Sequence, residues 1–356
     1  MPVSKHFTQG KQYWEQGKYK EAIIELHIAL QEDSTYMPTY YYLGKSLLSL
    51  KSFHPAKHYF QKLIDSQSEA QSEAGQKTSD YYDSLAMCEQ HLGEHELANQ
   101  HYDLALSHDS KNQSALHNKA LLGLILAEQI EHHTEAYTHL KTKSIELLTE
   151  LLAYNNTHEY AWNTKARWFE LDEKYDEATQ FYLKAKQYCP ESDSQLRQII
   201  STNLAQCAAQ AGHIYYKAGD YSSAIQYYRI ALQEDKTVTP ALYHLGWSYY
   251  FSKLYDEAQT QFTTLYEIET KPEDKADALV GRAACFRERQ KYLPAEQDLQ
   301  LAKQLSPEDQ TVTQELDKLK PALDKLKTAS TVIWRFWQKT SHRDAPTTTN
   351  SHMAQP

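Results

Sequence analysis

Small residues and large apolar residues recur along this chain with a period of 34 residues. An alanine falls at the same phase of seven segments, and Ala22 with Ala56, like Ala224 with Ala258, are 34 residues apart. If that alanine is position 20 of a repeat, position 8 is glycine or alanine in the same segments. The seven alanines are Ala22, Ala56, Ala98, Ala178, Ala224, Ala258 and Ala295. Such a period is typical of stacked supersecondary units, each too small to bury its own apolar face.

Aromatic residues keep the same phase as the alanines. Position 17 is aromatic in each of these segments except at His95, and position 24 is always Leu, Phe or Tyr. Small residues at positions 8 and 20 predict two helices that cross closely, with the large residues filling the space between successive pairs. Glycine at position 15 (Gly17, Gly93 and Gly219) predicts a left-handed turn at the end of the first helix. The pattern therefore predicts an all-α chain of helix pairs.

We count eight repeats, the fourth of them interrupted. They span residues 3–36, 37–70, 79–112, 113–158, 159–192, 205–238, 239–272 and 276–309. In the fourth repeat, the first helix keeps the register of the third repeat and the second helix keeps that of the fifth. This places a 12-residue insertion at 130–141, between the two helices.

Beyond the repeats, the spacing of apolar residues predicts a capping helix at 310–327. Pro321 is expected to kink or restart that helix. The tail at 328–356 is rich in Thr and Ser and is expected to be mostly disordered. Its aromatic segment 334–337 is expected to dock on the protein itself, on a partner or on a membrane surface, because three aromatic side chains are costly to leave in water. The alternative is that this segment is a loosely ordered continuation of the capping helix.

The residues at these positions resemble the tetratricopeptide repeat family, whose pattern is W-x2-L-G-x2-Y, then A-x3-F-x2-A and a proline. The fifth repeat matches at Trp162, Ala166, Phe169, Ala178, Tyr182, Ala185 and Pro190. The seventh repeat matches at Leu245, Gly246, Tyr249, Ala258 and Phe262. The resemblance covers about Val3 to Asp309 and implies a right-handed α-solenoid. It specifies a fold much more closely than a ligand.

Charge and composition narrow the classes of function. The net charge is -10, whereas nucleic-acid-binding proteins carry a basic excess, so we expect no nucleic-acid partner. No apolar run has the length of a signal peptide or a membrane span, so we expect neither Sec export nor stable membrane insertion. The cysteines, Cys88, Cys189, Cys207 and Cys285, lie far apart. We expect them to be reduced thiols in a cytoplasmic protein, with export by another route left open.

Sequence motifs for catalysis and cofactor binding are absent. The chain has no GxGxxG, GxxxxGK[ST], GxSxG or HExxH, and the repeats leave little room for a catalytic domain. The densest polar cluster is Glu131, His132, His133, Glu135 and His139 in the insertion. It is a poor zinc candidate, because two adjacent histidines cannot share one helical face. We therefore expect no catalytic residue, no metal site and no cofactor, and a solvated polar insertion.

The remaining functional candidate is the inner face of the first helices. In the family, positions 2, 5, 6, 9, 12 and 13 line a concave surface, and the resemblance places aromatic, histidine and polar side chains there. They are Trp14, Tyr41, Tyr42, Asn163, Arg167, His213, Tyr216, Tyr243, His244, Trp247, Tyr250 and Phe251. Aromatic side chains beside convergent polar groups are typical of peptide sites. We expect Tyr243 and Trp247 to lie on a face away from the packing residues Gly246 and Tyr249.

The expected function is a non-enzymatic scaffold or adaptor that holds a protein or peptide of unknown identity in this groove. The alternative is a regulatory or chaperone-like subunit that acts on an enzyme or a secretion partner in trans. One family ligand is not expected. The clamp for the C-terminal carboxylate of heat-shock chaperones needs Lys and Asn at positions 5 and 9 of one repeat, where the first repeat has Phe7 and Lys11. It also needs Lys and Arg at positions 2 and 6, where the third repeat has Asp80 and Ser84.

Overall fold

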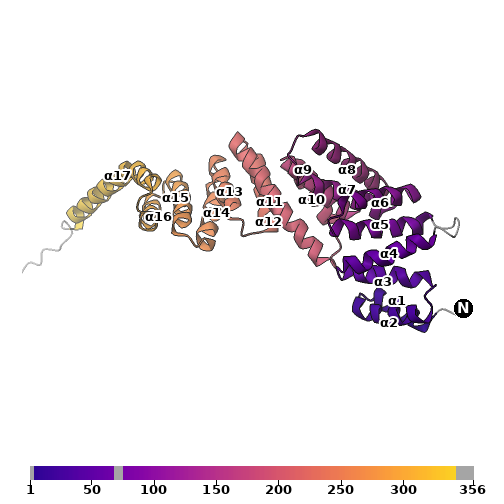
Figure 1. The fold of residues 1–356 in the computed structure, drawn as a ribbon. Coiled ribbons are helices and arrows are strands. Elements are labelled where there is room, and N and C mark those ends of the chain that lie inside the picture. The colour runs from indigo at the N-terminus through magenta and orange to yellow at the C-terminus, as the bar shows by residue number, and fades with distance from the viewer. Residues whose placement is uncertain (1–3, 68–74, 342–356) are drawn as a thin grey trace, which may run out of the picture. The chain divides into compact units, whose positions relative to one another are not determined.

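The structure, a computed structural model, describes residues 4–67 and 75–341 (Figure 1). In these residues the chain forms seventeen α-helices and no strand, which confirms the expected all-α repeat fold. The helices are α1 (Lys5–Glu15), α2 (Tyr19–Glu32), α3 (Met37–Ser49), α4 (Phe53–Gln67), α5 (Gly75–His91), α6 (His95–His108), α7 (Gln113–Ala127), α8 (Glu135–Tyr154), α9 (Glu159–Leu171), α10 (Tyr175–Tyr188), α11 (Ser194–Ala218), α12 (Tyr221–Glu234), α13 (Thr239–Phe251), α14 (Tyr255–Ile268), α15 (Pro272–Glu288), α16 (Tyr292–Leu305) and α17 (Gln310–Ser341).

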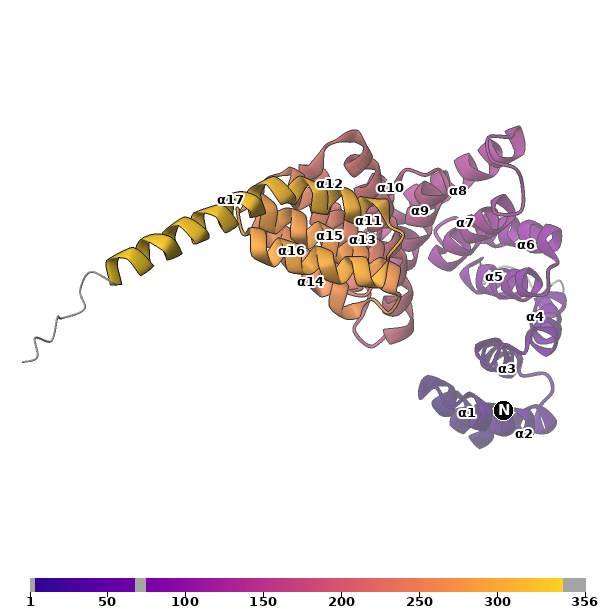
Figure 2. The ribbon, with the colours of Figure 1, turned by 90° about the vertical axis from the view of Figure 1, so that its left-hand side faces the viewer.

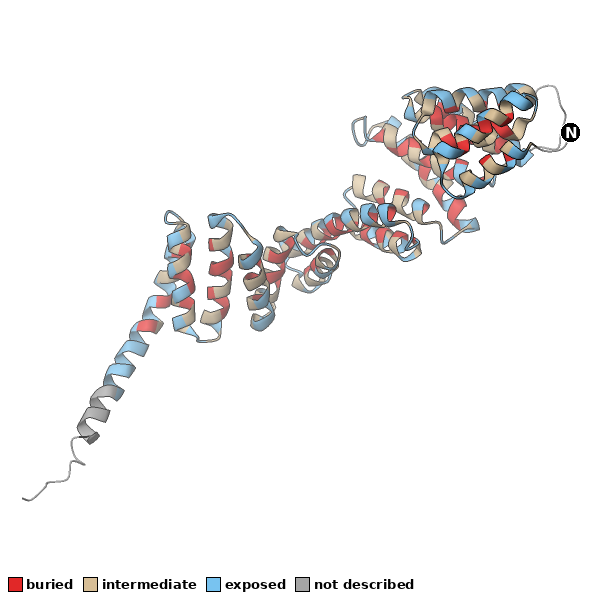
Figure 3. Ribbon diagram, turned by 90° about the horizontal axis from the view of Figure 1, so that it is seen from below, coloured by how far each residue is buried: buried red, intermediate tan, exposed pale blue. Residues whose placement is uncertain are grey.

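The helices form two compact units, an N-terminal unit of residues 1–200 and a C-terminal unit of residues 201–356. Helix α11 passes from the first unit into the second. Within each unit a helix packs mainly on its neighbours in the chain, as α5 does on α6 and α15 does on α16. Figure 3 shows the result: buried residues gather on the facing sides of these helices, and the outer sides are exposed.

A left-handed residue ends the first helix of seven repeats. Gly17, Gly93 and Gly219 have φ of +72°, +80° and +79°, as the sequence predicts. The same position 15 adopts this conformation without glycine in four other repeats, at Lys51, Glu173, Lys253 and Gln290. The turn is therefore dictated by the helix pair, and glycine is the residue that adopts it without steric cost.

Glycine at position 8 makes room for the large residue at position 24 of the same repeat. A Cβ added to Gly212 would lie 2.9 Å from Cδ1 and Cε1 of Tyr228. A Cβ added to Gly246 would lie 2.8 Å from Cε1 and Cζ of Phe262. The close crossing of the two helices thus places a ring directly on a glycine backbone.

The insertion in the fourth repeat lengthens a helix instead of forming a long loop. Helix α7 ends at Ala127 and α8 begins at Glu135, where the Thr134 hydroxyl accepts a hydrogen bond from the backbone N–H of Tyr137 at 3.1 Å. The expectation of a solvated insertion is wrong at Tyr137, which is only 2% exposed. Its hydroxyl donates to Asp172 Oδ1 at 2.6 Å, and its ring lies 5.9 Å from that of Trp168, so the added turns pack on the fifth repeat.

Helix α17 continues past Pro321 and past the expected end at residue 327. Leu319 and Leu323, on either side of the proline, are buried against α15 and α16. This packing holds the helix where proline removes one backbone hydrogen bond. The expected disorder is therefore wrong for residues 328–341. Residues 342–356 and the side chains of the aromatic segment 334–337 lie outside the described part of the chain.

Candidate functional site

Seven of the residues selected from the sequence come together in the C-terminal unit, on α11 and α13. They are His213, Tyr216, Tyr243, His244, Trp247, Tyr250 and Phe251, here called the α11–α13 cluster. The other five lie on α1, α3 and α9 of the N-terminal unit.

Rings of the α11–α13 cluster are in direct contact. The His244 centroid is 4.9 Å from those of both His213 and Tyr216, and 5.2 Å from that of Tyr243. Tyr243 in turn lies 6.3 Å from Trp247 in an edge-to-face arrangement. Such contacts stabilise aromatic pairs beyond the area that they bury. The two helices therefore carry one continuous aromatic surface.

Phe251 is the exposed end of this surface. Its side chain is 47% exposed, and its ring stacks on Tyr221 at 4.9 Å, a residue that the sequence analysis did not select. Beside it, the Tyr250 hydroxyl donates to Glu288 Oε1 and accepts from the Arg287 guanidinium, each at 3.2 Å. The hydrogen bonds fix Tyr250, whereas Phe251 presents an open apolar face.

Trp247 contributes to the core as well as to the cluster. Its ring lies 5.3 Å from the fully buried Phe262, and it packs on the group of buried residues that includes Cys285. The expectation that Trp247 lies clear of the packing residues is therefore wrong. The physical reason is that Phe262, at position 24, reaches across to the face that Trp247 occupies. Truncating Trp247 would disturb the fold and the cluster together.

A pocket of about 280 Å³ opens between α11, α12 and α13. It is lined by Ala209, Gln210, His213, Tyr228, Pro240, Ala241 and His244. Tyr228 is 1% exposed, and its hydroxyl has no hydrogen-bond partner. The buried Nδ1 of His244 also has none. Buried polar atoms in proteins are nearly always paired, so two unpaired atoms on one pocket call for an explanation.

Other repeats show what Tyr228 lacks. In the third repeat, the position-24 hydroxyl of Tyr102 donates to Gln90 at position 12, at 3.0 Å. In the fifth repeat, the hydroxyl of Tyr182 donates to Glu170, again at position 12. In the sixth repeat, position 12 is Tyr216, which belongs to the α11–α13 cluster. The acceptor that the other repeats supply is replaced by an aromatic ring, so the Tyr228 hydroxyl has no acceptor among the described residues.

The histidines of the pocket are neutral at neutral pH. Burial lowers the pKa of His244 to about 4, with smaller contributions from His213 and Lys217. Burial and the Lys217 charge also lower the pKa of His213. The pocket therefore offers hydrogen-bonding groups from a hydroxyl and two neutral imidazoles.

The selected residues of the N-terminal unit are mostly engaged with their own neighbours. The ring of Trp14 lies 5.2 Å from that of Tyr42, and both pack on the core around α1 to α3. Tyr41 lies 5.7 Å from Tyr81 of the next repeat.

On α9 the two selected residues differ. The Arg167 guanidinium is ion-paired with Glu128, whereas Asn163 keeps a buried Oδ1 without a partner.

The sequence analysis missed a polar network on the first helices of repeats three and four. Asp83 is 2% exposed, and its carboxylate accepts from Ser114 at 2.7 Å and from Asn118 at 3.0 Å. Burial raises the pKa of Asp83. These residues occupy the inner positions 2, 5 and 6, so the phase alone could have found them, but the residues selected there did not include them. Because both carboxylate oxygens are already paired, the network is structural.

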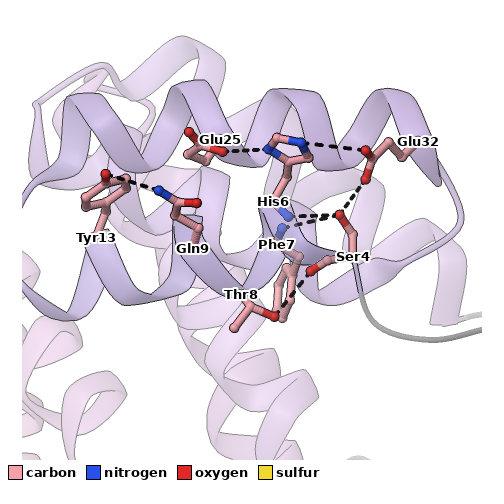
Figure 4. Close-up of polar contacts among 8 residues, drawn as sticks. All are labelled: Ser4, His6, Phe7, Thr8, Gln9, Tyr13, Glu25 and Glu32. Atoms are coloured by element: carbon pink, nitrogen blue, oxygen red, sulfur yellow. Dashed lines mark hydrogen bonds and ion pairs between the residues drawn. The ribbon is translucent and has the colours of Figure 1, made fainter.

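A second polar cluster joins α1 to α2 (Figure 4). The His6 ring contacts Glu25 at 2.7 Å, and the Ser4 hydroxyl donates to Glu32. Ser4 also caps α1 by accepting from the backbone N–H groups of His6 and Phe7. A serine nucleophile would need its hydroxyl hydrogen-bonded to the histidine. Here the hydroxyl donates a hydrogen bond to a carboxylate instead, so the cluster stabilises the packing of α1 on α2.

Other kinds of site find little support in the described residues. There, no group of three or more His, Cys, Asp and Glu side chains is placed to hold a metal ion. The four cysteines are buried and none of them forms a disulfide in the described residues, and burial raises the pKa of Cys88 and of Cys285 to about 12. Among the same residues, no helix combines the length and apolar character needed to cross a membrane.

The part of the chain that carries this site matches a known protein family. The sequence profile of the tetratricopeptide repeat family matches residues 209–260, which include the pocket and the α11–α13 cluster. No curated protein is significantly similar to the chain.

Solved structures of tetratricopeptide repeat (TPR) proteins are similar in part. They include YrrB, described as a TPR protein with an unusual peptide-binding site, at 16% identity over 61% of this chain and 97% of that one (TM-score 0.39). The C-terminal part of a TPR protein from Cytophaga hutchinsonii is 12% identical over 87% and 99% (TM-score 0.47). The second TPR domain of human RPAP3, solved with an HSP70 peptide, is 22% identical over 33% and 98% (TM-score 0.30). With TM-scores below 0.5, these likenesses carry no weight for function.

Proposed function

We propose that this chain, a tetratricopeptide repeat protein, is a non-enzymatic scaffold that binds an extended peptide segment of a partner protein across α11 and α13. The observation that carries the proposal is the Tyr228 hydroxyl, which is buried and unpaired on the wall of a pocket. Leaving a buried hydroxyl unpaired costs about 1–3 kcal/mol. A ligand that supplies an acceptor recovers this free energy on binding.

The chemistry of the site suggests which side chains the peptide presents. The pocket volume of about 280 Å³ suits one side chain with a hydrogen-bonding end, which Tyr228 and the neutral His244 can both contact. The stacked rings of Tyr221 and Phe251 suit an apolar side chain nearby. Exposed aromatic rings of this kind are frequent hot spots, because they lose little conformational entropy on binding.

A selection experiment tests the proposal without knowledge of the natural partner. A phage-displayed library of random peptides is selected on the full-length protein, with subtraction on the Phe251→Ala variant. The selected peptides are then titrated by fluorescence anisotropy. Phe251→Ala should weaken binding by about 2 kcal/mol, or roughly thirtyfold. Tyr228→Phe should weaken it by about 1 kcal/mol, or roughly fivefold, because it removes one hydrogen bond.

The stability of matched variants separates a ligand contact from a structural one. Tyr228→Phe removes a hydroxyl that has no partner in the protein, so the free energy of unfolding should stay the same or rise. Tyr102→Phe removes a paired hydroxyl and should lower it by about 1 kcal/mol, with no effect on peptide binding. If no peptide is selected, or if Tyr228→Phe binds the selected peptides as the wild type does, the proposed site is wrong.

A further inference from the structure

The C-terminal half of α17 has an apolar side that no other helix of its unit covers. Leu319 and Leu323 are buried against α15 and α16, but beyond them, on the same side of the helix, Leu326 is 41% exposed and Ile333 67%. Val332, which is 61% exposed, lies about 100° around the helix from Ile333. Figure 2 shows this part of α17 extending clear of α16. A helix of this length without tertiary contacts is marginal in water, since helical stability in proteins comes mainly from packing.

The charge of this segment is opposite to that of the chain. Residues 325–341 contain Lys325, Lys327, Arg335 and Lys339 and no Asp or Glu, whereas the whole chain has a net charge of -10. The same stretch contains all three Phe and Trp residues that follow residue 300, in the segment 334–337. A basic helical segment with large apolar residues is typical of helices that lie in a membrane surface.

We propose that residues 325–341 of α17 bind the surface of a membrane rich in anionic phospholipids and lie in the interface without crossing the bilayer. Charge favours this occupant over the same segment of a second copy, because pairing two such segments would bring four positive charges against four. Anionic headgroups neutralise them, while Leu326 and Ile333 enter the acyl boundary. The inference does not depend on the peptide site.

Vesicle cosedimentation of the full-length protein tests this proposal. The probes are vesicles of phosphatidylcholine alone and vesicles in which about one third of the lipid is phosphatidylserine. The protein should bind the anionic vesicles, bind the neutral ones much more weakly, and be released by salt. Replacing two lysines, as Lys325→Gln with Lys327→Gln, should lower the partition coefficient about 25-fold, since each basic residue near the surface contributes about fivefold.

A matched control lies on the same helix. Lys318→Gln with Lys320→Gln removes the same charge from the part of α17 that packs on the C-terminal unit, where the lysines are paired with Glu315 and Asp317. This variant should bind the anionic vesicles nearly as the wild type does. Circular dichroism melts of all variants confirm that each is folded.

Three results would overturn the proposal. The first is no cosedimentation with anionic vesicles at low salt. The second is an equal loss of binding in the Lys318 and Lys325 pairs of variants, which would show that only overall charge matters. The third is a combination of two results: the protein does not bind lipid, and it self-associates in analytical ultracentrifugation whereas the Ile333→Ser variant does not. That combination would assign the apolar side to a second copy of the chain.

Discussion

Replacing Gly281 by alanine should destabilise the C-terminal unit through the ring of Phe262. The new Cβ would lie 2.5 Å from Cε1 and Cζ of that ring, a separation that real Cβ atoms do not show. Phe262 is fully buried, and Gly246 of α13 already approaches the same two ring atoms. The ring is therefore held between the backbones of α13 and α15 and has little room to move.

The net effect is a difference between two opposing contributions. Overpacking a core typically costs about 1–3 kcal/mol. Exchanging glycine for alanine inside a helix gains roughly 0.5–1 kcal/mol. We therefore expect Gly281→Ala to lower the free energy of unfolding by about 0.5–2 kcal/mol. Because Trp247 lies 5.3 Å from Phe262, a displaced ring should also weaken binding of a peptide that uses the α11–α13 cluster.

A double-mutant cycle measures this clash. Gly281→Ala, Phe262→Leu and the double variant are compared by denaturant unfolding, with hydrogen exchange in α13 to α15 as the probe of the C-terminal unit. Leucine lacks Cε1 and Cζ, so the double variant should be more stable than the sum of the single effects by at least about 0.5 kcal/mol. The reasoning fails if Gly281→Ala is as stable as the wild type, or if the two substitutions are additive.

Three further predictions concern local chemistry. Gly219→Ala should lower the free energy of unfolding, measured by thermal melts, by about 1 kcal/mol, because φ is +79° there. Lys253→Gly, at the same position of the next repeat, should leave the free energy of unfolding unchanged or raise it. The free energy of unfolding should fall as the pH drops from about 6.5 to about 4, because His244 is protonated more readily in the unfolded chain. The variant His244→Gln should flatten that part of the pH profile. If the profile of the variant is the same as that of the wild type, His244 is not buried as described. Cys88 and Cys285 should react with a thiol reagent only as fast as the protein unfolds, and rapid labelling of the native protein would show that they are accessible.

The repeat phase predicted the fold because the same contact is made again in each helix pair. Position 15 is a left-handed turn even where it is Lys51 or Glu173, so the geometry of the pair imposes the conformation. The phase of the repeat does not predict which element contains the inserted residues. In the fourth repeat they extend α8 from Glu135, and the sequence did hold a signal for this: Thr134 is an N-cap residue, followed by good helix formers. Counting the period shows how many residues are added and leaves their conformation open.

The candidate site was predicted only in part, for a related reason. The inner positions include both His213 and His244, and the structure places their rings 4.9 Å apart. Tyr228 was assigned to packing because position 24 fills the space between helices. A tyrosine can do both: its ring packs on Gly212 while its hydroxyl lines the pocket. A pattern of residue size along the chain does not show where the polar end of a packed side chain lies.

Position 12 connects the packing of the repeats to the proposed function. Where this residue is Gln90 or Glu170, it accepts the hydroxyl of the position-24 tyrosine and completes the core of its repeat. In repeats six and seven it is Tyr216 and Tyr250, and both belong to the aromatic surface of α11 and α13. In repeat six this change of residue type leaves the Tyr228 hydroxyl without an acceptor and adds a ring to the surface, whereas in repeat seven position 24 is Phe262, which needs no acceptor. The tetratricopeptide pattern leaves position 12 unspecified, so the residue there can change, as the proposed site requires, while the residues that hold the helix pair together stay the same.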